Sequence, residues 1–266
     1  MFVNILQEIA MHTKARVEAQ KNVVPLQQVM DMACLGSRHD FPFEKALKHK
    51  DIAFICEIKR ASPSKGVIAE EFHYVDIAKD YEVAGSAAIS VLTEPLWFKG
   101  SDLYLREIAD AVKTPLLRKD FTVDKYMIYE AKLLGASAVL LICSILDRAT
   151  LAEYIDTAHS IGLSALVETH DENEVYMALQ AGARIIGVNN RNLKTFEVDI
   201  TLSERLKKLV PPEVIFVSES GITSADDVEK LRGIGTDAVL IGESIMRSVD
   251  KKAAINNLRG YEHGKN

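Results

Sequence analysis

Hydrophobic and polar positions follow a regular order along most of the chain. From residue 52 onward, short apolar runs alternate with segments in which apolar residues recur every three or four positions. Continuous apolar runs are typical of parallel strands buried on both faces, and the longer period is typical of amphipathic helices. The pattern predicts eight strands, each followed by a helix. The predicted strands span residues 54–59, 87–93, 115–120, 138–143, 163–169, 185–190, 214–220 and 238–242.

The first fifty residues follow a different pattern, in which no strand is predicted. Residues 1–22 have an apolar stripe that includes Ile5, Leu6 and Ile9, which predicts a helix ended by Pro25. Weaker helical patterns follow at 26–34 and 43–49. We therefore expect two parts: an N-terminal helical extension over residues 1–51 that caps the fold, and a single catalytic domain over residues 52–266.

A weak internal repeat supports the strand count. Gly85, Gly135, Gly182 and Gly235 recur at intervals of about fifty residues, each where a predicted helix ends. Glycine at such a position fits a left-handed helix C-cap. The interval corresponds to two strand–helix units, so the repeat predicts four pairs of units.

Eight strand–helix units in about two hundred residues predict an α/β fold of the (β/α)8 TIM-barrel class, with an N-terminal helical extension. The main alternative is a doubly wound open sheet, which usually has fewer strands and a glycine-rich nucleotide-binding turn after its first strand. Here that turn contains Lys59, Ser62 and Pro63 and no GxGxxG motif. The barrel is the better prediction.

Polar side chains gather at the predicted carboxyl ends of the strands, where barrels of this class carry their chemistry. Glu57 and Lys59 are two residues apart, so both point to the same face of the first strand. The other strand ends carry Lys119 and Asp120, Glu168, Asn189 to Arg191, Glu219 to Gly221, and Gly242 to Ser244. Buried lysines and glutamates beside apolar groups have shifted pKa values, so we expect a lysine acid and a glutamate base here.

The last two strand ends predict a phosphate site. Gly221, and Gly242 to Ser244 at the start of a short helix, leave backbone N–H groups free to bind an anion. Ser62 and Lys65 in the first loop are placed to reach the same anion.

Composition limits the remaining classes of function. Hydrophobic residues make up 48% of the 266 residues and the net charge is −6, so there is no basic surface typical of nucleic-acid binding. The three cysteines, Cys34, Cys56 and Cys143, form no CxxC pair, which favours reduced thiols and a cytoplasmic location. Cys56 is out of phase with Glu57 and should face the helices. We predict no membrane association, no signal peptide and no metal site, because the histidines show no ligand spacing.

The motifs at these strand ends, taken together, resemble those of the indole-3-glycerol-phosphate synthase family of tryptophan biosynthesis. The similar stretches span nearly the whole predicted barrel, in matching order, and the N-terminal extension is also similar. They are residues 57–66, 117–121, 167–168, 187–193, 218–222 and 241–246. The resemblance implies a cofactor-free ring closure that converts 1-(2-carboxyphenylamino)-1-deoxyribulose 5-phosphate into indole-3-glycerol phosphate, carbon dioxide and water.

The resemblance also implies a role for each site residue. Lys119 is the expected general acid at the carbonyl oxygen, Lys59 the partner of the substrate carboxylate, and Glu168 the general base of the dehydration. Glu57 and Glu219 orient the lysines and stabilise the iminium cation, and Asn189 and Arg191 hold substrate groups in place. The implied phosphate site is Ser62, Ser220, Gly221, Gly242 and Glu243, and the implied aryl pocket is Pro63, Phe98, Phe121, Leu140 and Leu193.

Glu243 departs from the family pattern, in which a small hydroxyl residue is expected. A carboxylate repels a phosphate, so we expect the side chain of Glu243 to turn away and its backbone N–H to bind.

Two rival functions are considered. Phosphoribosylanthranilate isomerase is a smaller barrel, with a cysteine base at its first strand end and an aspartate at its sixth. A non-catalytic phosphate-ligand binder on the same fold would leave the paired lysines and glutamates unexplained. We expect a small phosphorylated substrate as the ligand and a monomer or weak homodimer.

Overall fold

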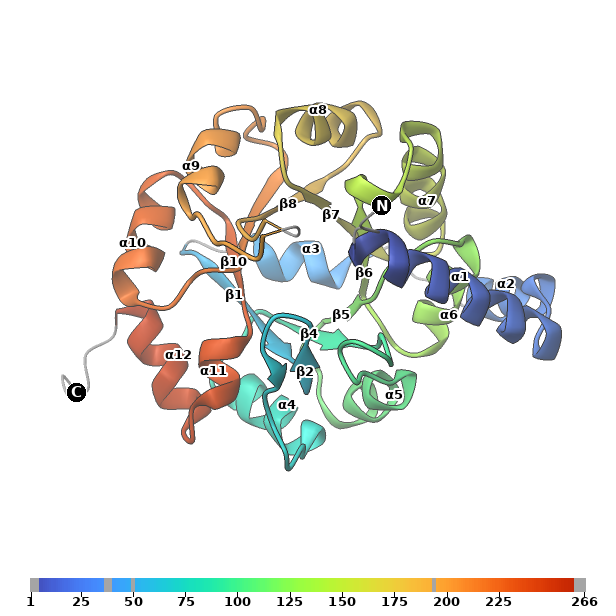
Figure 1. Cartoon of the computed structure of the whole chain (residues 1–266), viewed down its shortest axis with the longest axis horizontal. Helices are drawn as coiled ribbons and strands as arrows, with labels where there is room; N and C mark the ends of the chain where they lie inside the picture. The colour runs from blue at the N-terminus through green and yellow to red at the C-terminus, as the bar shows by residue number, and fades with distance from the viewer. Residues whose placement is uncertain (1–4, 36–39, 49–50, 193–194, 261–266) are drawn as a thin grey trace.

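The computed structural model describes residues 5–35, 40–48, 51–192 and 195–260. Eight parallel strands close into a barrel in the order β1-β10-β9-β8-β7-β6-β5-β4, with helices around the outside (Figure 1). The (β/α)8 barrel predicted from the sequence is confirmed. The barrel strands are β1 (Ala53–Ile58), β4 (Ala88–Leu92), β5 (Leu116–Lys119), β6 (Ala138–Ile142), β7 (Ser164–Thr169), β8 (Ile185–Asn189), β9 (Ile215–Glu219) and β10 (Ala238–Ile241).

Each barrel strand lies within two residues of its predicted position at either end. The helices between and after the strands are α4 (Tyr74–Val83), α5 (Asp102–Ala111), α6 (Lys125–Leu133), α7 (Arg148–Ser160), α8 (Glu172–Gln180), α9 (Thr201–Lys207), α10 (Ala225–Gly233), α11 (Glu243–Arg247) and α12 (Lys251–Arg259). A short 3₁₀ turn (Cys143–Ile145) follows β6.

Two hydrophobic layers hold the barrel together. Outward-facing strand residues pack under the helices, and Cys56 belongs to this layer with no exposed surface, as its phase predicts. Inward-facing residues such as Ile55, Leu117 and Leu166 fill the barrel interior. Burying both faces of every strand explains why the strands are continuous apolar runs.

Left-handed glycines end several of the helices before the next strand begins. Gly85, Gly135, Gly182 and Gly235 have φ angles of 75°, 88°, 84° and 77°. A residue with a Cβ is strained in this conformation, so glycine is favoured. The repeated joints in the sequence are therefore helix C-caps, as predicted.

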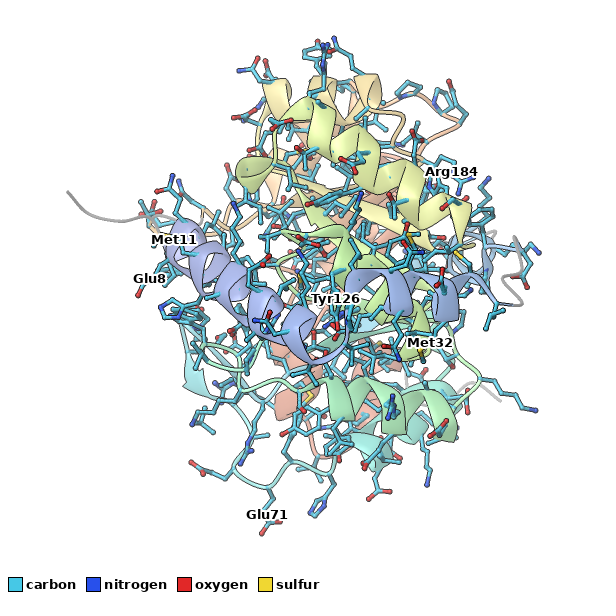
Figure 2. All side chains as sticks on the ribbon, turned by 90° about the vertical axis from the view of Figure 1, so that its right-hand side faces the viewer. Glu8, Met11, Met32, Glu71, Tyr126 and Arg184 are labelled. Carbon is cyan, nitrogen blue, oxygen red and sulfur yellow. The ribbon has the colours of Figure 1, made fainter. Side chains whose placement is uncertain are left out.

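The N-terminal extension reaches both ends of the barrel. Helix α1 (Ile5–Val23) brings Leu6 and Ile9 to the cavity at the carboxyl ends of the strands. Helix α2 (Leu26–Cys34) packs along α6 on the outside, and Figure 2 shows Met11 and Met32 on the outer faces of α1 and α2.

Helix α3 (Pro42–Leu47) closes the opposite end of the barrel. Its Phe43 and Leu47 are buried in the barrel interior, at the amino ends of the strands. The inward positions at four of these strand starts are small, which leaves space for the two side chains. They are Ala53, Ala88, Ala138 and Ala238.

The sequence pattern missed one element, an antiparallel pair formed by β2 (Ala61–Ser62) and β3 (Gly66–Val67) in the loop after β1. Strands of two residues are too short to show a period. The hairpin matters because it folds Ser62 and Lys65 over the site.

Candidate active site

A cavity of about 730 Å³ opens at the carboxyl ends of the barrel strands. It is lined by the predicted site residues from β1 to α11, and by Leu6 and Ile9 of helix α1. Every residue that was assigned a role lines this cavity if it lies within the described ranges, whereas Leu193 lies outside them. Asn190, which was also noted at a strand end, does not line the cavity and contacts Ser218 and Ser203 instead. The lining includes Glu57, Lys59, Ser62, Pro63, Phe98, Lys119, Phe121, Leu140, Glu168, Asn189, Arg191, Glu219, Ser220, Gly221, Gly242 and Glu243.

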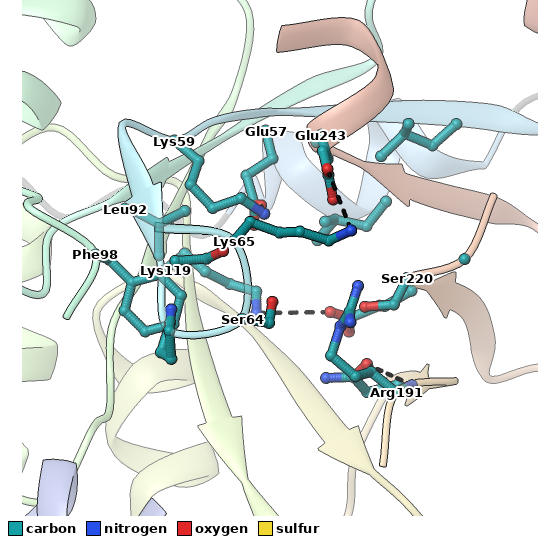
Figure 3. A pocket seen from close by; sticks show the side chains of 18 of the residues that line it. Glu57, Lys59, Ser64, Lys65, Leu92, Phe98, Lys119, Arg191, Ser220 and Glu243 are labelled. Atoms are coloured by element: carbon teal, nitrogen blue, oxygen red, sulfur yellow. Dashed lines mark hydrogen bonds and ion pairs between the residues drawn. The ribbon is translucent and has the colours of Figure 1, made fainter. Parts of the chain in front are cut away.

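Two lysines and three carboxylates line the cavity together. Figure 3 shows Glu57, Lys59 and Lys119 among them. Lys119 Nζ lies 3.3 Å from Glu168 Oε2 and 3.7 Å from Glu219 Oε2. Lys59 Nζ lies 2.5 Å from Glu57 Oε1. The three carboxylates are buried, with 5% or less of each residue exposed. Such a group of charges is costly unless the charges are paired, and here each lysine has a carboxylate partner.

The pKa values of the three glutamates are shifted in different directions, because their surroundings differ. Burial favours the neutral acid for all of them, but Lys59 and Lys119 outweigh burial at Glu57 and lower its pKa. Lys119, His170 and the Asn189 amide do the same for Glu168. Burial prevails at Glu219, where Glu168 and Glu57 add to it and Lys119 only partly offsets it, so its pKa rises to about 8.

The pKa of Lys119 is shifted, but its carboxylate neighbours decide the direction and not the apolar groups beside it. Burial alone would lower the pKa of Lys119, but the carboxylates of Glu168, Glu219 and Glu57 prevail and raise it above its ordinary value. Among the glutamates, the pKa of Glu219 is raised, whereas that of Glu168, the predicted base, is lowered. Apolar neighbours can be inferred from a sequence, whereas the number of carboxylates around one lysine depends on the closed barrel.

Two glycines leave room for these charged groups. A Cβ built at Gly242 would lie 2.6 Å from Glu57 Oε1 and 3.2 Å from Lys59 Nζ. A Cβ at Gly187 would overlap the Glu219 carboxylate. Both close approaches leave no room for a Cβ, so these positions require glycine.

The buried carboxylate of Asp120 holds the end of β5 in place. Asp120 accepts hydrogen bonds from Thr93 Oγ1 at 2.7 Å and from the Phe121 backbone N–H at 2.8 Å. Its Oδ2 also pairs with Arg16 of helix α1 at 2.8 Å. Asp120, which directly follows Lys119, therefore connects the N-terminal extension to the end of β5.

Aromatic groups line the side of the cavity near β4 and β5. Glu94 accepts hydrogen bonds from the backbone N–H groups of Leu96, Trp97 and Phe98 at 2.8–3.0 Å, which fixes the loop after β4. The rings of Phe98 and Phe121 are 6.1 Å apart at their centroids. Together they form an apolar wall beside Lys119.

The opposite side of the cavity is suited to an anion. Ser220 and Gly221 after β9 both have left-handed backbones, with φ of 67° and 82°, and α11 begins at Glu243. Lys65 of the hairpin lies 3.7 Å from Glu243, and Arg247 lies 3.2 Å from the same carboxylate. Arg247 was not predicted, although its spacing of four residues from Glu243 on one helix was visible in the sequence.

Sequence reasoning also missed His170, which directly follows the end of β7. Its Nε2 lies 3.4 Å from Glu168 Oε1. Its spacing of two residues from Glu168, across the end of β7, was the available signal, because this spacing favours the same face of an extended chain.

Within the described ranges, no group of three or more histidine, cysteine or acidic side chains has the arrangement of a metal site. Among the same residues, no helix is long and apolar enough to span a membrane.

The closed barrel and the cavity at its strand ends define a (β/α)8-barrel enzyme with paired lysine and glutamate side chains. A family model described as indole-3-glycerol phosphate synthase matches residues 6–258. The indole-3-glycerol phosphate synthase of Ruminiclostridium cellulolyticum is 60% identical over 96% of this chain and 99% of its own. That of Leuconostoc mesenteroides is 53% identical over 91% and 93%. The chain belongs to the indole-3-glycerol phosphate synthase family, which makes it a carboxy-lyase of tryptophan biosynthesis.

Solved structures of low sequence identity share the fold. The 3-hexulose-6-phosphate synthase of Salmonella typhimurium has a TM-score of 0.64 at 16% identity, over 79% of this chain and 98% of that one. A mutant tryptophan synthase α-subunit from Pyrococcus furiosus has a TM-score of 0.61 at 14% identity, over 79% and 99%. These similarities concern the barrel alone.

Proposed function

We propose that the chain closes the indole ring of 1-(2-carboxyphenylamino)-1-deoxyribulose 5-phosphate, with release of carbon dioxide and water. The observation that carries the proposal is the contact of Lys119 with both Glu168 and Glu219 in a cavity that has an apolar wall on one side and an anion site on the other. These three features match the carbonyl, the aryl ring and the phosphate of this substrate.

The proposed ring closure begins at Lys119. Its ammonium group protonates the ribulose carbonyl oxygen while the aryl carbon that bears the carboxylate attacks the carbonyl carbon. Lys59, which is held by Glu57, pairs with the substrate carboxylate until carbon dioxide leaves and the ring becomes aromatic again. Carboxylates around the site stabilise the positive charge that develops on the aryl group.

Dehydration completes the proposed reaction. A lysine ammonium protonates the new hydroxyl group, which leaves as water and gives an iminium cation. Glu168 then removes a proton from the neighbouring ring carbon, which forms the indole. Glu168 suits this role because its lowered pKa keeps it ionised at neutral pH. Asn189 and Arg191 hold the substrate between these groups.

The remaining lining residues have proposed binding roles. Ser62, Ser220, Gly221 and Gly242, with the backbone N–H of Glu243, bind the phosphate. Pro63, Phe98, Phe121 and Leu140 enclose the aryl ring, and Leu193 is assigned to the same pocket from the sequence alone. Residues 1–51 act as a cap on residues 52–266, a role supported by the contact of α1 with the cavity and of α3 with the barrel interior.

The rival isomerase is disfavoured at two strand ends. Its cysteine base is lacking, because Cys56 is fully buried among the outer packing residues, and β8 ends in Asn189 rather than an aspartate. Three free cysteines support a reducing, cytoplasmic setting. A monomer or weak homodimer remains the proposed state.

The proposal is tested by incubating the purified chain with the anilino-deoxyribulose phosphate and following indole fluorescence. We expect product to form without added metal or cofactor. A chain that folds, binds this substrate and forms no indole product would exclude the proposed reaction.

A further inference from the structure

His170 joins the proposed base to a second group of polar side chains outside the cavity described above. Its Nε2 faces Glu168 Oε1 at 3.4 Å. On the other side of the ring, Nδ1 lies 3.2 Å from Glu174 Oε2 and 3.2 Å from Ser144 Oγ. The imidazole is mostly buried, with 16% of the side chain exposed. It therefore connects two carboxylates through opposite ring nitrogens.

The partners of His170 are themselves fixed. Ser144 donates to Glu174 Oε1 at 2.6 Å, and the other oxygen of Glu174 accepts the backbone N–H of His170 at 2.7 Å. Glu174 lies in the first turn of α8, where Asp171 caps the helix by accepting from the Glu174 N–H. The ring is thus held in one orientation by α8 and by the turn after β6.

A second cavity, of about 600 Å³, lies beside this group. It is lined by Ser144, His170 and Glu174, and it meets the main cavity at Asn189 and Arg191. Glu168 lines the main cavity and not the second one. His170, like Asn189, therefore lies between Glu168 and the second cavity.

The charges that face the imidazole favour its cationic form. Glu168 and Glu219 face it from the barrel, and Glu174 faces it from α8, while Lys119 pairs with Glu168 on the far side. Burial lowers the pKa of His170, but the hydrogen bond to Glu174 and the charges of Glu168 and Glu174 raise it above its ordinary value. Glu219 adds to this rise where it is ionised, which is above about pH 8. The other charged groups on the second cavity are Asp171, Arg191, Glu197, Asp199 and Arg205.

We propose that His170 is a positioning residue that keeps the Glu168 carboxylate ionised and aimed at the reacting ring carbon, with Glu174 and Ser144 fixing the imidazole behind it. A cationic imidazole carries a proton on both nitrogens. Nδ1 is within hydrogen-bond distance of Glu174, and Nε2 faces Glu168 as an ion pair at 3.4 Å. The Glu168 carboxylate then has Lys119 on one oxygen and His170 on the other, so it cannot rotate freely. This inference rests on the proposed function, because it assigns the orientation of that reaction's base.

Replacing His170 by glutamine tests the inference through the pH–rate profile. The variant removes the positive charge beside Glu168, which raises the pKa of that carboxyl. The acid limb of kcat/KM then moves to higher pH. We expect kcat at pH 7 to fall about ten- to a hundredfold, because a misplaced catalytic group costs up to about 10²-fold. KM stays within about twofold of wild type, since phosphate and aryl binding are untouched.

Glu174→Gln is a second variant, which keeps a hydrogen-bond acceptor at Nδ1 but removes a negative charge. It should lower the pKa of His170 and shift the acid limb in the same direction by a smaller amount. If His170→Gln fails to fold by circular dichroism, this variant decides the question. His73→Gln is the matched control, because His73 is 73% exposed in its side chain and lies outside both cavities.

Rescue of kcat by added imidazole distinguishes the proposed role from a purely structural one. A variant that had lost only packing would not recover activity with imidazole. His170→Ala leaves space next to the second cavity, and imidazole in the assay buffer should restore part of the lost kcat. An unshifted acid limb in both charge variants, or a loss of kcat that imidazole does not rescue, would overturn the role of His170. If the wild-type chain forms no indole product, the proposed function fails instead, so the two failures are distinguishable.

Discussion

The ammonium group of Lys119 lies 3.3 Å from the carboxylate of Glu168, across the barrel from β5 to β7. In the proposed reaction the first residue donates a proton and the second accepts one later. Their contact allows the proton that Glu168 removes from the ring carbon to return to Lys119 after the product leaves. The contact therefore recovers one of the two protons that the lysines donate, and the other comes from solvent. The raised pKa of Lys119 favours this return of the proton from Glu168.

Replacing Lys119 by alanine should abolish turnover while substrate still binds. A general acid contributes about 10²–10⁴-fold to the rate, and here the carbonyl oxygen would lose its only close ammonium donor on β5. Single-turnover kinetics and substrate binding by equilibrium titration measure the two effects separately. Lys125→Ala is the control, because Lys125 pairs with Glu153 on the outer surface. A near-normal rate in Lys119→Ala would remove the assignment.

The stability of the protein should fall as pH rises towards 8, because of Glu219. Its pKa is about 8 in the folded protein and 4.5 ordinarily, so the folded state holds a proton that the unfolded state releases between these values. Stability from this group is fully present below pH 4.5 and is lost as pH rises through 8. Glu219→Gln should remove this loss, which is of the order of a few kcal/mol, since one pKa unit equals about 1.4 kcal/mol.

Urea unfolding at pH 5.5 and pH 8.5 measures this effect in the wild type and in Glu219→Gln. The variant should be the more stable of the two at pH 8.5 and should vary less with pH. Equal pH dependence in both proteins would show that Glu219 is ionised in the folded state.

Most of the fold and of the site was predictable because both depend on local patterns. The eight strands are apolar runs, and the strand ends converge in any closed parallel barrel, so Glu57, Lys119 and Glu168 had to meet. The network behind them was not predictable. Whether Glu174 reaches the imidazole of His170 depends on how α8 packs against the turn after β6, and neither segment shows this in its own sequence.

The sequence also could not predict the two-residue strands of the hairpin or the position of α3. The apolar stripe of α3 shows that the helix is buried, but not where it packs. The alanines that admit Phe43 at the barrel bottom lie on four different strands, and their common role appears only once the barrel closes.

Gly242→Ala should separate the charged pair at the end of β1. The new methyl group would lie 2.6 Å from Glu57 Oε1, so the carboxylate must move and Lys59 loses its close partner. We expect kcat/KM to fall about a hundredfold, as for other small displacements of catalytic groups. Gly233→Ala is the control, since no atom lies within 4 Å of its added methyl group, and it should leave kcat unchanged. Wild-type kinetics in Gly242→Ala would contradict the close approach.

Phe43→Ala should reduce stability without affecting substrate binding. Phe43 is fully buried in the barrel interior at the end remote from the cavity. Removing such a side chain costs about 3–5 kcal/mol, and chemical denaturation measures it. KM should change by less than about twofold, because none of the cavity contacts is lost. A large rise in KM in a folded variant would mean that the bottom of the barrel and the site are coupled.

Glu243→Ser should bind substrate as well as wild type or more tightly. The Glu243 carboxylate pairs with Lys65 at 3.7 Å and with Arg247 at 3.2 Å, so both cations are partly neutralised in the protein without substrate. A serine frees them for the phosphate and removes a negative charge beside it, while the backbone N–H at the start of α11 is kept. We expect KM to stay equal or fall by up to about tenfold, with a steeper dependence on ionic strength. Glu153→Ser carries the same charge change on the outer surface and should leave KM unaltered. If Glu243→Ser instead loses substrate affinity, the carboxylate itself contributes to binding, and the phosphate cannot lie at the start of α11.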